Sequence, residues 1–257
     1  MDTLQGQHAV VTGGSRGIGA AIAAELSRLG ANLTIMSRDQ AKLDAKAGEI
    51  AKATGVEVAG VACDVASASS IEAAFRIARE TLGPPTILVN NAGQASSGRV
   101  AEISREAWDR MLGVNLTGPF LCIQQVLPAM LEAKRGRIVN VVSMMAIKGY
   151  ARVAAYSASK AGLIGLTRAV AREVARSGIT VNAVCPGYTD TGMASEAART
   201  LAKSGMSLEE ARAKIVGTLP RKDLIRPEEV ASLVGWLCMP GASAVTGQVI
   251  AASAGEA

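Results

Sequence analysis

The sequence predicts an α/β protein in which helices cover both faces of a doubly wound, mostly parallel sheet of seven strands. Short apolar runs of β type alternate with longer helical patterns along the chain, which is the order that such a sheet requires. Apolar residues make up 49% of the 257 residues and aromatic residues only 3%, so small aliphatic side chains must fill a closely packed core. No repeat, low-complexity tract or linker interrupts the pattern, and we expect a single domain over residues 1–257.

The charge and hydropathy patterns exclude two classes of partner. The chain has 27 basic and 22 acidic residues, and because the basic residues are scattered we expect no nucleic-acid partner. No apolar stretch approaches the roughly 20 residues of a transmembrane helix. Residues 1–8 lack the basic and apolar regions of a signal peptide. These features predict a cytoplasmic protein that does not associate with a membrane.

The cysteines and the single histidine predict no metal site. Four widely spaced cysteines form no Cys-x-x-Cys motif, so neither disulfides nor bound zinc are expected. These residues are Cys63, Cys122, Cys185 and Cys238. His8 is the only histidine and precedes the first strand. We expect it to be structural or solvated rather than part of a Ser-His-Asp triad.

A glycine-rich turn joins the first predicted strand to the first predicted helix. The strand covers residues 9–11, the turn reads TGGSRGIG over residues 12–19, and the helix covers residues 20–29 before Gly30. Small residues let a pyrophosphate approach the backbone, and a helix N-terminus supplies amide donors and the positive end of a dipole. The turn therefore predicts a nucleotide site. The alternative is a flexible turn that binds nothing.

The end of the second strand predicts which dinucleotide binds. Sites for NAD usually carry an acidic residue there, which binds the ribose 2′-hydroxyl. Residues 32–36 form the strand here, and Ser37 and Arg38 follow it with no acid before Asp39. Arg38, together with Arg16 of the glycine-rich turn, is suited to a 2′-phosphate. The alternative is that both arginines are ordinary surface charges.

The rest of the first half predicts two helices and two strands that end in polar residues. The helices are expected at residues 39–53 and 67–82, and the strands at residues 56–63 and 87–90. Asp64 ends the first of these strands, where it could bond an adenine amino group, cap the next helix, or do both. Asn91, Ala92 and Gly93 follow the second strand.

A serine, a tyrosine and a lysine follow the fifth predicted strand. Ser143 comes directly after the strand at residues 138–142, and Tyr156 and Lys160 lie in a helix predicted over residues 154–175. Four residues apart, Tyr156 and Lys160 share one helix face. A tyrosine has a reference pKa of about 10, which a nearby ammonium lowers. Such a group can transfer a proton while serine bonds a substrate oxygen and a cofactor carries a hydride. The alternative is a solvated helix face.

The motifs taken together resemble those of the short-chain dehydrogenase/reductase family. They are TGGSRGIG at residues 12–19, NNAG at residues 90–93, Asn115, Ser143, YSASK at residues 156–160 and PG at residues 186–187. The resemblance covers nearly the whole chain and is closest to 3-oxoacyl thioester reductases and polyketide ketoreductases. It implies a Rossmann-type three-layer fold and a nicotinamide-dependent enzyme that interconverts a ketone and a secondary alcohol.

The resemblance assigns roles to four residues. Tyr156 would donate or accept the proton, Lys160 would bind the nicotinamide ribose and lower the tyrosine pKa, and Ser143 would orient the substrate oxygen. Asn115 would hold a water that links Lys160 to solvent. From its own helical pattern, residues 104–131, an isolated asparagine more often faces solvent or bends the helix. Its catalytic role therefore depends on the resemblance alone.

The predicted binding residues fall into two groups. The cofactor group is Gly13, Ser15, Arg16, Gly17, Ile18, Gly19, Arg38, Asp64, Val65, Asn91, Ala92, Gly93, Tyr156, Lys160, Pro186, Gly187 and Thr189. The substrate group is Ser143, Met145, Tyr150, Tyr156, Tyr188 and Met193. Met144 and Met206 could line the same apolar pocket, or the methionines could be plain core. NADP(H) is expected to be preferred, with NAD(H) possible.

The second half of the chain predicts a lid and an assembly. A sixth strand is expected at residues 179–185, and a helical pattern broken by Gly205 and Gly217 resembles the family's substrate lid, at about residues 190–220. A last helix is expected at residues 227–239. The helices that contain Asn115 and Tyr156 carry more apolar surface than one sheet contact buries, which favours a homotetramer, as the resemblance does.

The end of the chain departs from the family pattern. Related sequences usually follow the final strand, expected here at residues 245–251, with an Asp-Gly-Gly-like turn, whereas this chain continues ASAGEA. The substrate is therefore open between a 3-oxoacyl thioester and a related ketone. Alternatives are an NAD-dependent secondary-alcohol or 3-hydroxyacyl dehydrogenase, a non-catalytic nucleotide-sensing protein, and an isomerase, epimerase or dehydratase.

Overall fold

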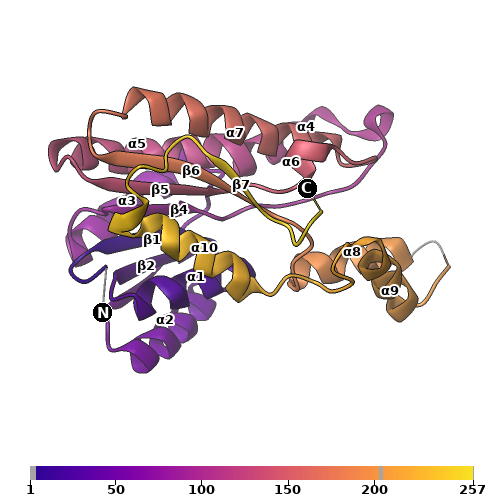
Figure 1. Cartoon of the computed structure of the whole chain (residues 1–257), viewed down its shortest axis with the longest axis horizontal. Helices are drawn as coiled ribbons and strands as arrows, with labels where there is room; N and C mark the ends of the chain where they lie inside the picture. The colour runs from indigo at the N-terminus through magenta and orange to yellow at the C-terminus, as the bar shows by residue number, and fades with distance from the viewer. Residues whose placement is uncertain (1–3, 203–204, 257) are drawn as a thin grey trace.

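The computed structural model describes residues 4–202 and 205–256, and a seven-stranded sheet forms its centre (Figure 1). The strands are β1 (His8–Thr12), β2 (Asn32–Ser37), β3 (Val58–Ala62), β4 (Ile87–Asn90), β5 (Gly136–Val141), β6 (Ile179–Pro186) and β7 (Val249–Ala252). Their order is β3-β2-β1-β4-β5-β6-β7, and each neighbouring pair is parallel. The predicted doubly wound fold is confirmed, and the sheet is parallel throughout rather than mostly parallel.

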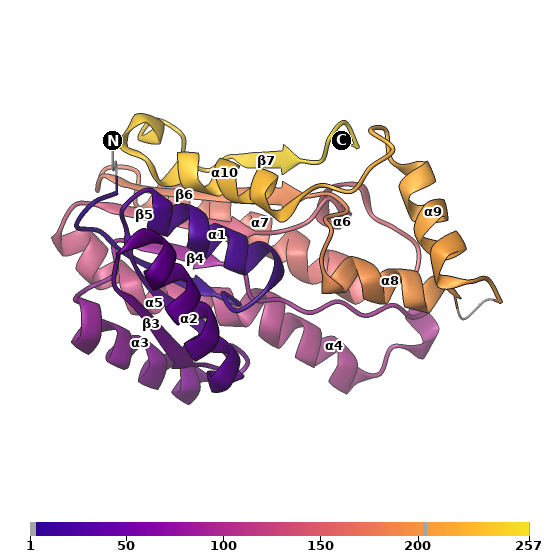
Figure 2. The ribbon, with the colours of Figure 1, turned by 90° about the horizontal axis from the view of Figure 1, so that it is seen from below.

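Helices form a layer on each face of this sheet (Figure 2). They are α1 (Gly17–Arg28), α2 (Gln40–Thr54), α3 (Ala68–Leu82), α4 (Arg105–Leu112), α5 (Gly118–Glu132), α6 (Met145–Lys148), α7 (Ala154–Glu173), α8 (Gly192–Ala202), α9 (Leu208–Thr218) and α10 (Pro227–Cys238). One buried cluster joins α1, α2 and α10 to the sheet, and a second joins α3, α5 and α7 to the opposite face. Side chains alternate along β1, since Ala9 and Val11 enter the first cluster and Val10 the second.

The order of the strands positions the site. The chain runs outward from β1 through β2 to β3, then returns to the other side of β1 with β4 and continues outward to β7. Open α/β sheets bind ligands outside the carboxyl ends of the strands at such a reversal. The expected glycine-rich turn follows β1 and the expected Asn91 follows β4, so both lie at this reversal.

Three local features differ from the prediction. The helix expected over residues 104–131 is interrupted by a π-helical turn, Gly113–Thr117, beside which Gly118 packs so closely that a Cβ there would lie 2.5 Å from the Val65 carbonyl oxygen. The short helix α6 follows Ser143 and was not predicted. The last strand begins at Val249 rather than at residue 245, because Gly247 turns the chain with a φ of 70°.

Other expectations concern histidine, cysteine and membrane helices. His8 is structural: its buried ring contacts the Gly83 carbonyl oxygen at 2.7 Å and the Thr34 hydroxyl at 2.9 Å, and burial lowers its pKa.

The four cysteines are free and buried. In the described ranges one helical stretch, Arg105–Glu132, is apolar and long enough to cross a membrane, but its α5 portion packs on the sheet against β4 and β5.

Candidate active site

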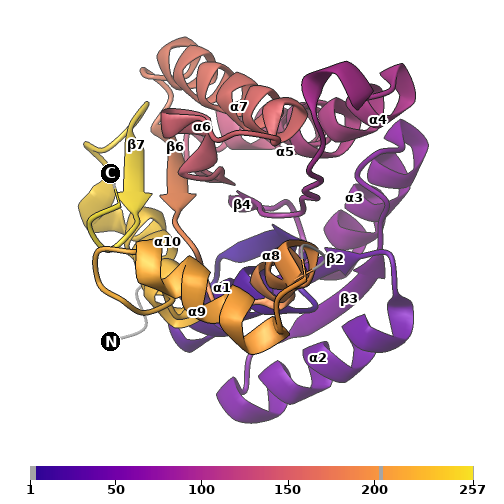
Figure 3. The same cartoon turned by 90° about the vertical axis from the view of Figure 1, so that its right-hand side faces the viewer.

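The predicted site residues follow the carboxyl ends of the central strands, and these ends face the viewer in Figure 3. Viewed from this edge, α6 lies on one side of β4, and α8 and α9 lie on the other. Ser143 follows β5, and the amide of Met144 donates to the carbonyl of Pro186 at the end of β6, over 3.0 Å. The loops after β5 and β6 are therefore held together beside the glycine-rich turn that follows β1.

Tyr156 lies in the first turn of α7 and is only 6% exposed. Burial raises the pKa of Tyr156, whereas the hydrogen bond between the Tyr156 and Ser143 side chains lowers it. The Ser143 hydroxyl oxygen accepts a hydrogen bond from the Met145 amide, over 3.2 Å, which fixes the serine in place. Two hydroxyl groups beside each other at a strand end can bond the same substrate oxygen, one of them donating its proton.

Lys160 lies one helical turn after Tyr156 and is almost fully buried. Its ammonium donates to the Val141 carbonyl over 2.8 Å. Burial lowers the pKa of Lys160 from 10.5 to about 8. Burial, the Ser143 side chain and Cys185 act on the pKa of Tyr156, and the expected effect of Lys160 on it stays a prediction. Lys160 is thus placed by α7 and β5, with its charge directed to the backbone.

Asn115 is fully buried within the π-helical turn, so the solvent-facing interpretation of its helical pattern is wrong. Its amide nitrogen donates to the Gln94 carbonyl over 2.9 Å and to the Ser159 hydroxyl over 3.1 Å, and its oxygen accepts from the Gln94 amide over 3.0 Å. A Cβ on Gly93 would lie 3.3 Å from this oxygen and 3.4 Å from the Lys160 ammonium. Asn115 and Lys160 therefore flank the same glycine, and π-turns are frequent at functional sites.

A buried polar network that the sequence did not predict supports the site from below. The Asn90 amide donates to Asn140 over 2.9 Å, and the Asn140 amide donates to the Thr167 hydroxyl over 2.9 Å. Thr167 in turn donates to the Leu163 carbonyl over 2.7 Å. Because unpaired polar groups are costly in a core, this series of hydrogen bonds fixes β4, β5 and α7 relative to one another. One feature of the sequence could have indicated the role of Asn140, since it is a polar residue within an otherwise apolar strand.

The glycine-rich turn fits a pyrophosphate. Gly13 has a φ of 68°, and a Cβ there would lie 2.8 Å from the Asn91 amide nitrogen. A Cβ on Gly19 would lie 2.2 Å from the Gly13 carbonyl oxygen. Arg16 precedes α1 and its side chain makes no capping hydrogen bond, so the first amides of the helix are available to an anion. The Asn91 side chain donates to the Thr12 carbonyl over 3.0 Å, which joins the ends of β1 and β4.

The predicted adenosine end lies after β2 and β3. The Ser37 hydroxyl is buried and has no hydrogen-bond partner in the part of the chain that the structure describes. Arg38 is exposed beside it, as is Arg16, and neither forms an ion pair within residues 4–202 and 205–256. Asp39 caps α2, accepting from the Lys42 amide over 3.2 Å and from its ammonium over 2.6 Å. These contacts hold the first available acid away from the end of β2.

Asp64 does not cap the next helix, so one of its two expected roles is wrong. Its carboxylate accepts from the Ala66 amide over 3.0 Å, and its own amide donates to the Ser70 hydroxyl over 2.9 Å. Ser67, rather than Asp64, is the residue that caps α3. Asp64 therefore shapes the loop after β3, and contact with an adenine amino group stays a prediction.

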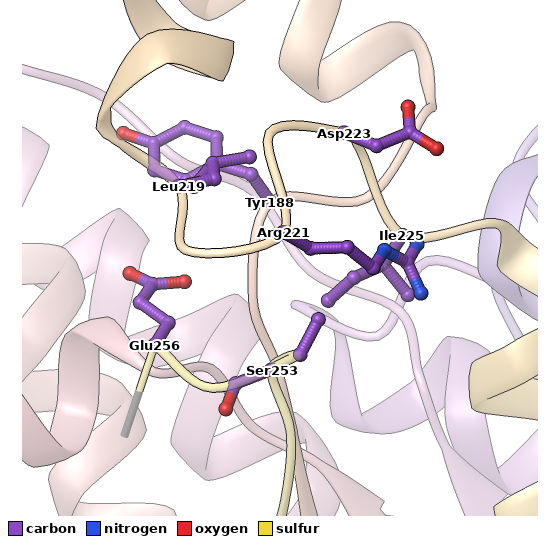
Figure 4. Close-up of a pocket in the computed structure, with 8 residues that line it drawn as sticks. Tyr188, Leu219, Arg221, Asp223, Ile225, Ser253 and Glu256 are labelled. Carbon is purple, nitrogen blue, oxygen red and sulfur yellow. The ribbon is translucent and has the colours of Figure 1, made fainter.

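The loop after β6 forms the other end of the site. The Gly187 amide donates to the Ala252 carbonyl over 3.1 Å, and the buried Thr189 hydroxyl donates to the Gly187 carbonyl over 3.0 Å. Tyr188 is half-buried and lines a small cavity with Leu219, Ile225, Ser253 and Glu256 (Figure 4). The structure therefore places Pro186 at the end of β6, and Gly187 and Thr189 in a fixed loop after it.

The predicted substrate residues lie in different environments. Met145 packs against Tyr156, and the Tyr150 hydroxyl donates to the carboxylate of Glu256, a residue that the sequence analysis did not single out. Met144 is buried in the core, so the alternative of plain core holds for it. Met206 is half-buried. Met193 begins α8, but its side chain lies outside the described part of the structure.

This fold and this site define a class of enzyme. Residues 7–202 match the family model described as short chain dehydrogenase. The chain belongs to the short-chain dehydrogenase/reductase family, whose members act on CH–OH and C=O groups with NAD(P).

Particular relatives resemble the chain over nearly its whole length. A 3-oxoacyl-[acyl-carrier-protein] reductase of Pseudomonas aeruginosa is 41% identical over 254 residues, which is 98% of each chain. A D-beta-hydroxybutyrate dehydrogenase of Cupriavidus necator is 35% identical and covers 96% of each chain. Among solved structures, a tryptophan variant of actinorhodin polyketide ketoreductase with NADPH superposes with a TM-score of 0.94 at 41% identity, over 97% of this chain and 96% of that one.

Proposed function

We propose that the protein is an NADP(H)-dependent reductase that interconverts a 3-oxoacyl thioester, or a related ketone, and the corresponding secondary alcohol. The observation that carries this proposal is the buried Tyr156 hydroxyl beside Ser143 at the end of β5, with Lys160 one turn further along α7. Such a pair can bond and protonate the oxygen of a carbonyl group. The nucleotide turn after β1 lies beside it.

Each catalytic residue has a separate task in this reaction. The nicotinamide cofactor supplies the hydride. Tyr156 donates its phenolic proton to the carbonyl oxygen as the alcohol forms, and Ser143 orients that oxygen. Lys160 holds the cofactor ribose, and Asn115 keeps the loop at Gln94 against α7 through hydrogen bonds to Gln94 and Ser159. When an alcohol is oxidised, Tyr156 accepts the proton of its hydroxyl group.

Two features support NADP(H) over NAD(H) as the cofactor. The end of β2 carries Ser37 and the free guanidinium of Arg38 where an acid would bind the 2′-hydroxyl of NAD, and Asp39 is engaged as a helix cap. A related ketoreductase has been solved with NADPH. Arginine makes strong charge-assisted hydrogen bonds to phosphate.

The substrate, assembly and compartment are part of the same proposal. The relatives' names point to two substrate types, a 3-oxoacyl group on a carrier protein and free 3-hydroxybutyrate. We favour the thioester, with a lid at about residues 190–220. There α8 packs against α9, and Arg212 of α9 pairs with Asp190 at 3.1 Å. The enzyme would act as a homotetramer in the cytoplasm.

A substrate panel tests this function. Purified protein with NADPH is given 3-oxoacyl thioesters, diketones and aryl ketones, and oxidation of NADPH is followed by its absorbance. Consumption of NADPH with formation of the 3-hydroxy product supports the proposal. Absence of turnover with every ketone, despite NADPH binding, would favour a nucleotide-sensing protein. A product formed without net NADPH oxidation would favour an isomerase, an epimerase or a dehydratase.

A further inference from the structure

A buried carboxylate lies beside the site in the segment that follows β7. Glu256 is 9% exposed, and one of its carboxylate oxygens accepts a hydrogen bond from the Tyr150 hydroxyl group. The other oxygen is buried and has no hydrogen-bond partner among the residues described. The Lys148 ammonium bonds the backbone carbonyl of Glu256 rather than its carboxylate. A buried acid is unusual, because it must be paired or else carry a desolvation cost.

The carboxylate packs on the loop that follows β6. A Cβ on Gly187 would lie 2.6 Å from the unpartnered oxygen, so the carboxylate packs directly on this glycine. Gly187 follows Pro186, whose carbonyl accepts from Met144, the neighbour of Ser143. The same oxygens face the cavity that Tyr188, Leu219 and Ile225 line at the base of α9 (Figure 4). Glu256 thus contacts Tyr150 and lines a cavity with Tyr188, and both tyrosines belong to the predicted substrate group.

Two cations lie near this carboxylate, and neither forms an ion pair with it within residues 4–202 and 205–256. Arg221 lines the same cavity, but its guanidinium pairs with Glu229 at 2.7 Å. The Lys148 ammonium bonds the backbone carbonyl of Glu256, so it offsets only part of the charge. Burial and the carboxylate both raise the pKa of Tyr150 and of Tyr188, so each phenol stays neutral.

We propose that Glu256 selects substrates by charge: it disfavours a free 3-oxo acid, whose carboxylate would lie near its own, and favours the neutral thioester. This inference depends on the proposed function, because it concerns the substrate of that site. Two negative charges that share a poorly solvated pocket repel strongly, whereas a thioester carbonyl meets no such repulsion. The residue therefore determines specificity and takes no part in proton transfer.

The test compares two probes of the same carbon skeleton, acetoacetate and the N-acetylcysteamine thioester of acetoacetate. Turnover of both probes with NADPH is measured. Calorimetry gives the affinity of the protein for acetoacetate and for neutral acetoacetamide. Glu256→Gln keeps an acceptor for Tyr150 and removes the charge. We expect it to lower the thioester-to-acid ratio of kcat/KM about tenfold, through a gain with the acid. Glu256→Met, which also lacks the charge, should give the same shift if the glutamine variant folds poorly.

Glu173→Gln is the matched control, because it removes one exposed acid at the far end of α7. It should leave both ratios at the wild-type value. Unchanged turnover and affinity ratios in Glu256→Gln and Glu256→Met would overturn the proposal. If wild type reduced neither probe, the proposed function would fail. The ratio of the affinities for acetoacetate and acetoacetamide, compared between wild type and Glu256→Gln, would still show whether the Glu256 charge disfavours an acid.

Discussion

Two tyrosines lie within six residues of each other, and their hydrogen bonds separate their roles. Tyr156 interacts with a neutral hydroxyl, that of Ser143, which lowers its pKa against the effect of burial. Tyr150 donates to the carboxylate of Glu256, and burial together with this carboxylate raises its pKa. A phenol that donates to a carboxylate holds its proton more tightly. Tyr156 is therefore the tyrosine suited to proton transfer.

Phenylalanine substitutions at these positions should have different effects. Tyr156→Phe should reduce kcat by at least about a thousandfold, since general acid catalysis contributes roughly that factor. The dissociation constant for NADPH should stay nearly constant, because only a hydroxyl is lost. Tyr150→Phe should keep kcat within about tenfold of wild type. Steady-state kinetics and a fluorescence titration of NADPH measure both quantities, and near-normal turnover in Tyr156→Phe would rule out the proposed proton transfer.

The pKa of Lys160 predicts how cofactor binding depends on pH. Because burial lowers this pKa to about 8, the ammonium is charged below that pH and loses its proton above it. Hydrogen bonds from a charged donor exceed neutral ones by roughly 1 kcal/mol, so the dissociation constant for NADPH should rise about fivefold between pH 7 and 9.5. The profile should be flat in Lys160→Met. A rise of equal size in that variant would assign the titration to another group.

Loss of the fold would not explain such a rise. A lysine whose folded pKa is lowered binds fewer protons in the folded than in the unfolded state between about pH 8 and 10.5. The contribution of Lys160 to the free energy of unfolding therefore increases with pH across this window. Lys160→Ala should weaken both cofactor binding and turnover, because the residue is expected to act in both.

The choice of cofactor should depend on the two residues at the end of β2. One charge-assisted bond from Arg38 to the 2′-phosphate is worth about 1.5–3 kcal/mol, which is a preference for NADP(H) of at least about tenfold. Ser37→Asp/Arg38→Ala should shift the ratio of kcat/KM for the two cofactors toward NAD(H). The same ratio is measured for Arg176→Ala, an exposed arginine after α7, as a control. If the wild-type protein favours NAD(H), then Arg38 is an ordinary surface charge and does not select the cofactor.

At the scale of single elements, the turn after α5 allows a test of stability. Lys134 has a φ of 48°, in the region that glycine favours, and its carbonyl oxygen would lie 2.3 Å from a Cβ on Gly178. Lys134→Gly should therefore raise the free energy of unfolding by about 0.5–1 kcal/mol, since the relief of strain exceeds the added chain entropy. Gly178→Ala should lower it by more than about 2 kcal/mol. Denaturant unfolding measures both changes, and stabilisation by Gly178→Ala would contradict this account.

The elements that the sequence predicted are those that local patterns determine. Alternating apolar runs and helical patterns, with glycine at the turns, were enough for the seven strands and the helices that join them. The π-turn at Asn115 was not predictable in this way. It depends on tertiary contacts, namely the approach of Gly118 to the Val65 carbonyl and the bonds from Asn115 to Gln94 and Ser159. Glu256 was missed for the same reason, because its partners are distant in sequence.

At the scale of the whole molecule, exposed apolar side chains lie on opposite faces. On α5, Phe120 and Leu131 are 42% and 41% exposed, and on the other face of the sheet Trp236 of α10 is 42% exposed. We expect each of these surfaces to be an interface, since grouped exposed apolar side chains such as the pair on α5 mark interfaces more often than isolated ones. Two separate self-complementary interfaces give a tetramer with dihedral symmetry, whereas one gives a dimer. The sequence predicted the first surface from its surplus of apolar residues and did not predict the second.

The assembly should therefore depend on α5. Light scattering of the wild-type protein should give four times the 26.3 kDa mass of the chain. Phe120→Lys places a charge in the expected α5 interface, where burial without a partner is costly, so the mass should fall to that of a dimer or monomer. Ile77→Lys is the matched control, because Ile77 is 40% exposed on α3 and should leave the mass unchanged. A wild-type mass of 26.3 kDa at micromolar concentration would contradict the tetramer, and equal effects of the two variants would show that α5 is not the interface.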